Sequence, residues 1–229
     1  MAYIVLLETA TEICSVGVSK NGEIIASLNA EKTYQHSERL TILIEKVVKE
    51  ANITLQDLNA VAISKGPGSY TALRIGTSTA KGICYALDLP LIAIDTLTTL
   101  AFAARQDRKY ENALYCPMID ARRMEVYASL FDAELNNIQP TQSMIIDEHS
   151  FEEYFSKGQE IVFVGNGASK CKKVLTHPLA RFKEIVCDAQ HLTALAQEKF
   201  KQKAFEDVAY FVPAYGKAPN ITTPKKILL

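Results

Sequence analysis

Three short strands close together at the start of the chain constrain its fold most strongly. The segments Tyr3–Thr9, Cys14–Ser19 and Glu23–Asn29 are rich in valine and isoleucine, which favour strands. Short links at Thr11-Glu12 and Asn21-Gly22 separate them, and Asn-Gly is a strong signal for a hairpin turn. Strands joined this tightly must run antiparallel. The chain is therefore predicted to begin with an antiparallel sheet.

Helices and strands alternate after this sheet. The apolar periodicity predicts helices over about 37–51 and 69–87 and from about 96, with strands over 60–65 and 91–95 between them. Thr54 and Asp57 have the spacing of a capping box. The order βββ-α-β-α-β-α adds parallel crossovers to the antiparallel strands. It predicts an α/β protein with the ribonuclease H-like lobe of the actin, sugar kinase and chaperone ATPase superfamily.

The second half has a weaker pattern of the same kind. The segments 115–120 and 125–131 flank Ala121-Arg122-Arg123 and are typical of a hairpin. A strand over 160–164 leads into Gly165-Asn166-Gly167, and residues 190–203 have a helical pattern. We predict two lobes, each with a mixed sheet flanked by helices, over residues 1–105 and 106–229. The proline-containing tail from Pro213 to Leu229 is predicted to be extended.

Composition excludes several classes of function. The 229 residues carry a net charge of −1, which argues against a protein that grips nucleic acid unaided. No apolar segment is long enough to span a membrane, and the N-terminus lacks the features of a signal peptide. The cysteines form no CxxC pair, and we expect reduced core residues of a cytoplasmic protein. They are Cys14, Cys84, Cys116, Cys171 and Cys187.

A glycine-containing turn before the second helix carries a family resemblance. The segment GPGSYTALRIG at 66–76, followed by Ala80-Lys81-Gly82, is similar to the TsaB/YeaZ family. Further similar segments are LLETAT at 6–11, QHSE at 35–38, IDAR at 119–122 leading to Glu125-Val126-Tyr127, and GNGA at 165–168. The similarity is dense over residues 1–105 and thinner beyond them.

This resemblance implies a role in making threonylcarbamoyladenosine (t6A) in tRNA. It implies a non-catalytic structural and activating subunit that binds TsaD, the catalytic paralogue, with TsaE as a further partner in the complex. The complex would transfer a threonylcarbamoyl group to the adenosine next to the anticodon of ANN-decoding tRNAs. This subunit would meet tRNA only through the complex and would form a weak homodimer when alone. It would hold no cofactor tightly, and ATP or ADP would bind only weakly or through the complex.

One departure separates this chain from its catalytic paralogue. TsaD-type proteins carry a His-x-x-x-His pair on the helix after Asp95, where both imidazoles face one metal. Those two positions hold Thr96 and Leu100 in this chain, and leucine cannot bind a metal. We therefore expect no metal site. The four histidines form no close pair elsewhere, and they are His36, His149, His177 and His191.

The turn at Gly66-Pro67-Gly68 has two interpretations. Gly66, Gly68 and Ser69, together with Arg74, could form an anion-binding turn, because free backbone N–H groups lie at a helix N-terminus. Alternatively, Pro67 and Gly68 would occupy the central positions of a type II turn. Lys81 does not complete a Walker A motif, so a P-loop is excluded.

Two other motifs leave an enzymatic alternative open. Glu8 lies where actin-like ATPases carry a metal-coordinating aspartate, so it either contacts nucleotide or keeps a structural hydrogen-bonding role. His36 and Ser37 precede a helix, where Ser37 fits an N-cap better than a nucleophile, since no triad signature accompanies it. The alternative function is a metal-independent peptidase or a weak ATPase of the actin-like superfamily.

The first two long helices carry the predicted partner-binding surface. On the helix over 69–87 apolar residues span an arc of about 200°, which is wider than one sheet contact needs. Ala72, Gly76 and Ala80 form a row of small residues that would allow a close helix–helix contact, or would pack on the chain's own sheet. Ile42 lies among charged residues of the other helix. The predicted partner-binding residues are Leu40, Ile42, Leu43, Ala72, Leu73, Gly76, Ala80 and Ile83.

Polar residues on the same helix and scattered lysines also have two interpretations. The polar arc of Tyr70, Arg74, Thr77, Ser78, Lys81 and Tyr85 is either solvated or forms a rim toward a partner or tRNA. The lysines are either solvated surface or phosphate contacts, and they are Lys170, Lys172, Lys173, Lys217, Lys225 and Lys226.

Overall fold

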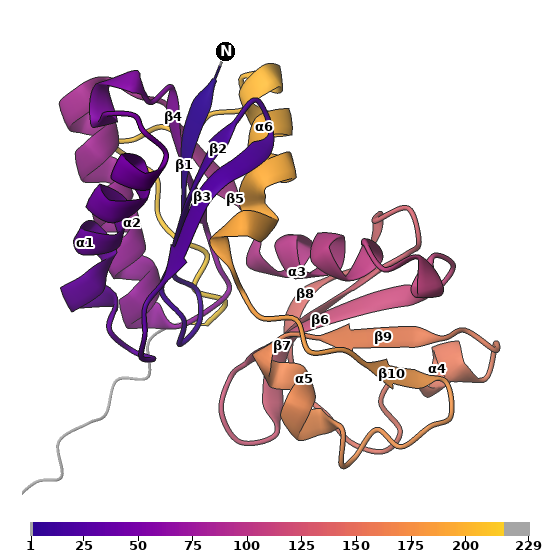
Figure 1. Ribbon diagram of the computed structural model, residues 1–229. Helices are drawn as coiled ribbons and strands as arrows, with labels where there is room; N and C mark the ends of the chain where they lie inside the picture. The colour runs from indigo at the N-terminus through magenta and orange to yellow at the C-terminus, as the bar shows by residue number, and fades with distance from the viewer. Residues whose placement is uncertain (1, 218–229) are drawn as a thin grey trace, which may run out of the picture.

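The computed structural model describes residues 2–217, which form two lobes with one five-stranded mixed sheet each (Figure 1). The N-terminal sheet has the order β3-β2-β1-β4-β5. Its strands are β1 (Tyr3–Glu8), β2 (Ser15–Lys20), β3 (Glu23–Asn29), β4 (Ala60–Ser64) and β5 (Leu91–Ile94). β1 pairs antiparallel with β2 and parallel with β4, and β5 is parallel to β4. This confirms the predicted antiparallel hairpins with parallel crossovers.

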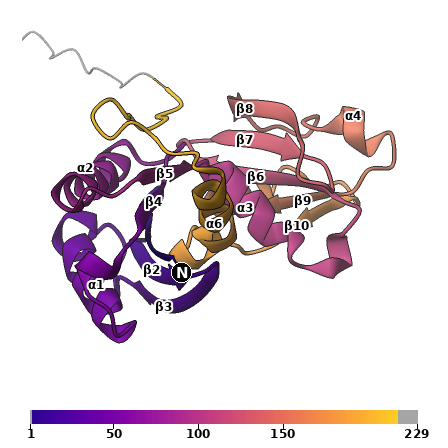
Figure 2. The same ribbon diagram turned by 90° about the horizontal axis from the view of Figure 1, so that it is seen from above.

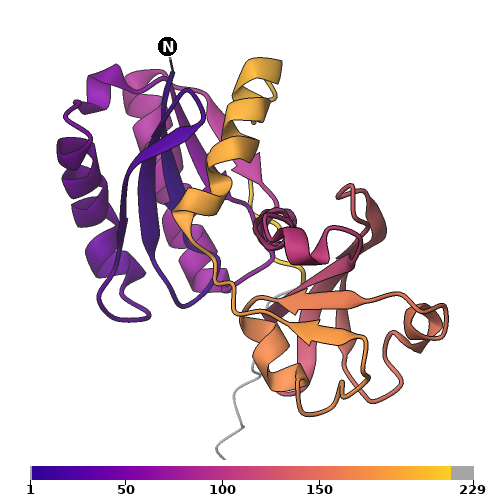
Figure 3. The ribbon, with the colours of Figure 1, turned by 45° about the vertical axis from the view of Figure 1, so that its right-hand side comes forward.

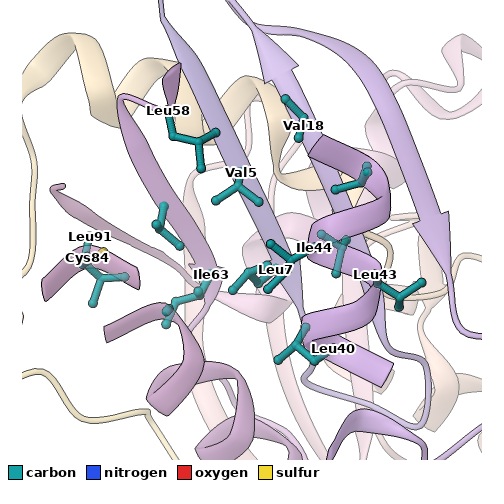
Figure 4. Packing of buried hydrophobic residues seen from close by; sticks show 14 of the residues in the cluster. Val5, Leu7, Val18, Leu40, Leu43, Ile44, Leu58, Ile63, Cys84 and Leu91 are labelled. Atoms are coloured by element: carbon teal, nitrogen blue, oxygen red, sulfur yellow. The ribbon is translucent and has the colours of Figure 1, made fainter. Parts of the chain in front are cut away.

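Two helices cover one face of this sheet, α1 (His36–Glu50) and α2 (Tyr70–Leu87). Leu40, Leu43 and Ile44 of α1 belong to the same buried cluster as Val5 and Leu7 of β1 (Figure 4). α1 buries only the stripe of residues that faces the sheet, which is the expected amphipathic pattern. The capping box of Thr54 and Asp57 is confirmed, and it begins the short 3₁₀ helix η1 (Leu55–Asp57).

The C-terminal sheet repeats the arrangement with the order β10-β9-β6-β7-β8, as predicted for a second copy. Its strands are β6 (Leu114–Asp120), β7 (Glu125–Phe131), β8 (Asn137–Ile145), β9 (Ile161–Val164) and β10 (Ala180–Phe182). The antiparallel β6-β7-β8 meander and the parallel β9 correspond to β1-β2-β3 and β4. The short helices α4 (Glu152–Phe155) and α5 (Asn166–Cys171) accompany this lobe, and the 3₁₀ helix η2 (Arg108–Tyr110) precedes it. The sheets have the topology of an actin-like fold.

The lobes exchange helices, so the predicted boundary at residue 105 is wrong. Helix α3 (Thr96–Arg105) packs on the C-terminal sheet through Leu97, Leu100 and Ala104. In return, the 3₁₀ helix η3 (Ala189–Leu192) and α6 (Thr193–Gln202) cover the second face of the N-terminal sheet. Figures 2 and 3 show α6 beside the N-terminal sheet, opposite α1 and α2. A domain boundary at residue 105 would separate each sheet from a helix that buries one of its faces.

The last described residues form a strap that runs from one lobe to the other. This C-terminal strap, residues 206–217, begins at a bridge between Glu206 and Leu91 of β5. Phe211 enters the core beneath α2, and the Ala214 N–H donates to the Lys65 carbonyl at 2.7 Å. The strap ends in an ion pair between Lys217 and Glu125 of β7. Residues 213–217 contain no helix or strand, and the rest of the tail that is predicted to be extended, residues 218–229 with Lys225 and Lys226, lies outside the described part.

All five cysteines are buried and free, which confirms their prediction as core residues. Burial raises the pKa of the Cys14 and Cys84 thiols to about 11, so both stay protonated and unreactive near neutral pH. Within residues 2–217, none of the helices has the length and apolar character needed to cross a lipid bilayer.

Candidate functional site

The outer edges of α1 and α2 enclose a shallow apolar groove. It has a volume of about 380 Å³ and is lined by Thr41, Leu55, Ser78, Thr79, Gly82, Ile83, Ala86 and Leu87. Gly82 has no atom within 4 Å of the position where a Cβ would stand, so the groove is open above it. Small residues such as Gly82, Thr79 and Ala86 keep the groove accessible to another chain. The pair of helices thus presents an apolar surface that this lobe does not fill.

Most of the predicted partner-binding residues are not on this surface. Six of them are buried in the chain's own lobe, namely Leu40, Leu43, Ala72, Leu73, Gly76 and Ala80. Only Ile42, at 39% exposure, and the half-buried Ile83 are within reach of another molecule. The prediction that the row of Ala72, Gly76 and Ala80 contacts a partner directly is therefore wrong, and its alternative, packing inside the chain, is correct.

Gly76 shows the physical reason for this correction. A Cβ at Gly76 would lie 2.2 Å from Thr9 Oγ1, far inside a normal contact distance. Thr9 follows β1 directly, so the glycine lets α2 approach the end of the central strand. Small residues on a helix permit a close approach, but helical periodicity cannot show which chain makes it. Gly82, which faces the groove, is the glycine that sequence reasoning missed.

The glycine turn before α2 is filled by the chain itself. A Cβ at Gly68 would lie 2.2 Å from the Ala10 carbonyl oxygen, and one at Gly66 would lie 2.2 Å from the Ala214 carbonyl oxygen. The Ser69 N–H donates to the Ala10 carbonyl at 2.7 Å. Two carbonyl dipoles thus point their negative ends at the predicted anion-binding turn. They oppose an anion there, so this prediction is not supported by the geometry.

The turn also differs from the predicted type II geometry. A type II turn with Pro67 and Gly68 at its centre needs a positive φ at Gly68. The positive φ lies instead at Gly66, at +108°, and the Gly66–Pro67 peptide bond is cis. The type II prediction is therefore wrong. Glycine is required at Gly66 both by its φ and by the approach of the strap.

Part of the polar arc of α2 holds the C-terminal strap, whereas Thr77 is buried and Ser78 lines the groove. Lys81 Nζ donates to the carbonyls of Ala209 at 3.0 Å and Phe211 at 3.2 Å. Tyr70 packs on Tyr215, with ring centroids 4.4 Å apart, and Arg74 lies over the Tyr70 ring. Arg74 therefore belongs to this aromatic contact. Within residues 2–217, its side chain forms no hydrogen bond with Gly66 or Gly68. Tyr85, at 88% exposure, remains free at the surface.

Glu8 is a buried carboxyl with a structural hydrogen-bonding role. Its Oε1 accepts from the Ala10 N–H at 2.7 Å and from Ser64 Oγ at 2.8 Å. Oε2 is buried and has no hydrogen-bond partner among the described residues. Loss of hydration raises the pKa of the Glu8 carboxyl to about 7, and the two hydrogen bonds offset only part of this effect. Glu8 therefore ties the end of β1 to β4.

His36 and Ser37 do not form a catalytic pair. His36 lies within 3.2 Å of the Ile13 carbonyl through Nε2, and burial lowers the pKa of its ring. Its ring contacts the backbone at the end of the loop after β1. The N-cap of α1 is Gln35 and Ser37 lies inside the first turn, so the prediction of Ser37 as the N-cap is wrong by two positions. The alternative of a hydrolase gains nothing from this geometry.

Thr96 and Leu100 stand where the resemblance places a histidine pair in TsaD. Both are buried on α3, and Leu100 packs on the C-terminal sheet. Within residues 2–217, no group of three His, Cys, Asp or Glu side chains is close enough together to hold a metal ion.

A polar network joins the lobes at the β6–β7 turn. Asn166 accepts from the Asp120 N–H at 3.0 Å through Oδ1 and donates to Glu12 at 2.8 Å through Nδ2. Lys170 pairs with Asp120 and also donates to the Glu125 carbonyl at 2.6 Å. Lys170 and Lys217 thus bind carboxylates of this chain, which argues against their interpretation as phosphate contacts. Their partners are far away in sequence, so no local pattern could have found them.

This chain is similar to known proteins in sequence and in structure. The family TsaD, tRNA N6-adenosine threonylcarbamoyltransferase, matches residues 23–225. The chain is 29% identical to the tRNA threonylcarbamoyladenosine biosynthesis protein TsaB of Bacillus subtilis, over 93% of both chains. It is 32% identical to the TsaB protein of Escherichia coli, over 72% of this chain and 71% of that protein. A Pseudomonas aeruginosa crystal structure, of a protein with similarity to peptidase YEAZ, matches with a TM-score of 0.79 at 23% identity, covering 95% of this chain and all of that one.

Substituting the two glycines of α2 should separate an internal contact from an open one. We expect Gly76→Ala to destabilise the fold by about 1–3 kcal/mol, because its Cβ would collide with Thr9. Gly82→Ala should stabilise it by about 0.5–1 kcal/mol, because alanine favours the helix and meets no atom there. Thermal and urea unfolding of both variants measure this difference. Equal shifts of the two midpoints would contradict the assignment.

The buried Glu8 carboxyl should make stability depend on pH. Its folded pKa of about 7 lies above the ordinary value of 4.5, so the folded state favours the protonated acid. Its contribution is fully present below pH 4.5 and is lost as pH rises through 7. This loss amounts to about 3 kcal/mol.

The variant Glu8→Gln isolates this effect, because a neutral amide still accepts from Ala10 and Ser64 but does not titrate. Urea unfolding at pH 5 and pH 8 should show wild type losing stability relative to Glu8→Gln as pH rises. A constant difference between the two proteins at both pH values would show that Glu8 does not carry the buried proton.

Proposed function

The chain belongs to the TsaB/YeaZ family, and we propose that it acts in t6A biosynthesis as the non-catalytic, activating subunit that binds TsaD. The observation that carries this proposal is the open apolar groove between α1 and α2. Apolar surface that a monomer leaves uncovered is a common mark of a protein interface. The groove lies on the helices that the family resemblance assigns to partner binding.

The relationship to TsaD suggests how the two subunits would fit together. The TsaD family matches this chain over residues 23–225, so the two proteins share most of this fold. If both present an equivalent helix pair, the pairs can pack face to face about a pseudo-twofold axis. The small residues Gly82 and Ala86 would then let a partner helix approach α2 closely. A second copy of this chain would use the same surface, which gives a weak homodimer when TsaD is absent.

Several features support a role without catalysis. Thr96 and Leu100 replace the metal ligands that the resemblance assigns to TsaD. Glu8 is fully enclosed, and the Ala10 and Ala214 carbonyls fill the glycine turn. For these reasons we expect ATP or ADP to bind this subunit only weakly or through the complex. A paralogue of this kind can activate TsaD by binding its active conformation preferentially.

The wider complex follows from the same proposal. TsaE would join the TsaD-bound subunit, and tRNA would reach it only within the complex. The substrate would be the adenosine next to the anticodon of ANN-decoding tRNAs.

The alternative function is a metal-independent peptidase or a weak ATPase. His36 and Ser37 do not form the catalytic pair that a peptidase would need.

Two substitutions in and beside the groove test the proposed interface. Gly82→Lys would place an ammonium group in the groove, and Ile42→Glu would add a carboxylate at the exposed residue that follows the groove residue Thr41 on α1. Burying either charge against an apolar partner is unfavourable, so TsaD affinity should fall about tenfold or more, which corresponds to about 1.4 kcal/mol. Thermal stability should stay near that of wild type, because both positions are exposed. Isothermal titration calorimetry with purified TsaD measures the affinity.

Lys201→Glu is a control with a charge reversal on α6, where Lys201 is exposed. This helix covers the face of the N-terminal sheet opposite α1 and α2, so the substitution should leave TsaD affinity unchanged. Normal TsaD binding by both Gly82→Lys and Ile42→Glu would exclude this groove as the interface.

A further inference from the structure

The turn between β6 and β7 presents two arginines in an unfavourable backbone conformation. Arg122 has a φ of 75° and Arg123 a φ of 50°, so two consecutive residues with a Cβ adopt the left-handed region. Glycine or asparagine adopts this region more easily than arginine does. Both arginines are exposed, so burial of their side chains does not explain their presence. Strained residues of this kind concentrate at functional sites.

The structure beneath the turn holds it firmly in place. The Arg122 N–H donates to Asp120 Oδ1 at 2.7 Å, and the Ala121 N–H donates to the Glu125 carbonyl at 3.0 Å. Lys170 binds Asp120 and the Glu125 carbonyl from α5. The arginine side chains are therefore displayed from a fixed backbone, which lowers the entropic cost of binding a ligand.

Neighbouring carboxylates are already engaged by other groups. Asp120 pairs with Lys170, and Glu125 pairs with Lys217 and accepts from Ser143. Glu12 accepts from Asn166. Within residues 2–217, neither Arg122 nor Arg123 forms an ion pair or a side-chain hydrogen bond. Both guanidinium charges thus remain available to an anion from outside the chain.

We propose that Arg122 and Arg123 form a phosphate-binding turn that contacts the tRNA backbone in the complex. This inference rests on the proposed role in tRNA modification. Guanidinium groups bind phosphate oxygens in pairs, and they remain charged at any physiological pH. Lys172 and Lys173 follow Lys170 at the end of α5, are exposed and form no ion pair within residues 2–217. A local patch of this size agrees with a net charge of −1, because it adds to an RNA surface that TsaD would share.

Replacing both arginines by glycine gives a sharp test. The double variant Arg122→Gly/Arg123→Gly removes both charges but suits a positive φ, so its melting temperature should equal or exceed that of wild type. Its complex with TsaD should bind an unmodified tRNA transcript about tenfold more weakly for each arginine lost. The slope of log Kd against log salt concentration should fall by about 1 for each lost contact. Arg108→Ala, at an exposed arginine at the other end of β6, should change neither quantity.

Two outcomes would overturn the inference. Unchanged tRNA affinity in the double variant, with an intact TsaD complex, would show that the turn does not contact RNA. A loss of TsaD affinity in the double variant, with no loss of tRNA affinity once the complex is saturated, would assign the arginines to an acidic protein surface.

A measurement on the chain alone distinguishes this inference from the proposed function. If wild type does not bind TsaD, the proposed function fails, but the turn can still be examined by NMR of arginine Nε–Hε signals. A short RNA oligonucleotide at high concentration should contact the turn weakly and shift the signals of Arg122 and Arg123 while leaving that of Arg108 in place, even though stable tRNA binding needs the complex. Shifts with a polyglutamate peptide but not with the oligonucleotide would contradict phosphate binding.

Discussion

The central strand β1 is apolar on both sides, and this constraint determines much of the architecture. Val5 and Leu7 face the core under α1 and α2, whereas Ile4 and Leu6 face the opposite side of the sheet. All four side chains are fully buried, so both faces of the sheet need a cover. The second cover is η3 and α6, which follow the whole C-terminal lobe in the chain. The chain must therefore return to its first lobe, and the two lobes form one folding unit.

The same constraint explains where a partner can bind. The inner faces of α1 and α2 pack entirely on the sheet. Gly76 allows α2 to lie in close contact with Thr9. Only the outer edges of the two helices remain, and there the small residues around Gly82 leave an apolar groove. The C-terminal strap crosses α2 along another flank, where it is held by Lys81. Partner binding and the connection between the lobes thus share one helix.

Local signals in the sequence were sufficient for the order of strands and helices along the first 105 residues. Asn21-Gly22 at the hairpin and the periodicity of α1 act within a few residues, so their predictions are confirmed. Contacts between distant segments could not be predicted in this way. The approach of Ala214 to Gly66, the position of α3 on the other lobe and the partners of Lys170 depend on residues far apart in the chain. The predicted partner surface failed for the same reason, because an arc of small residues does not reveal what packs on it.

A structure of the chain bound to TsaD would test the central claim most directly, through the area that each residue buries against the partner. The account predicts that Gly82, Ile83 and Ala86 lose their exposed surface to helices of TsaD, while Gly76 keeps its contact with Thr9. A complex in which TsaD buries only the C-terminal lobe, and leaves the groove between α1 and α2 open to solvent, would contradict this account.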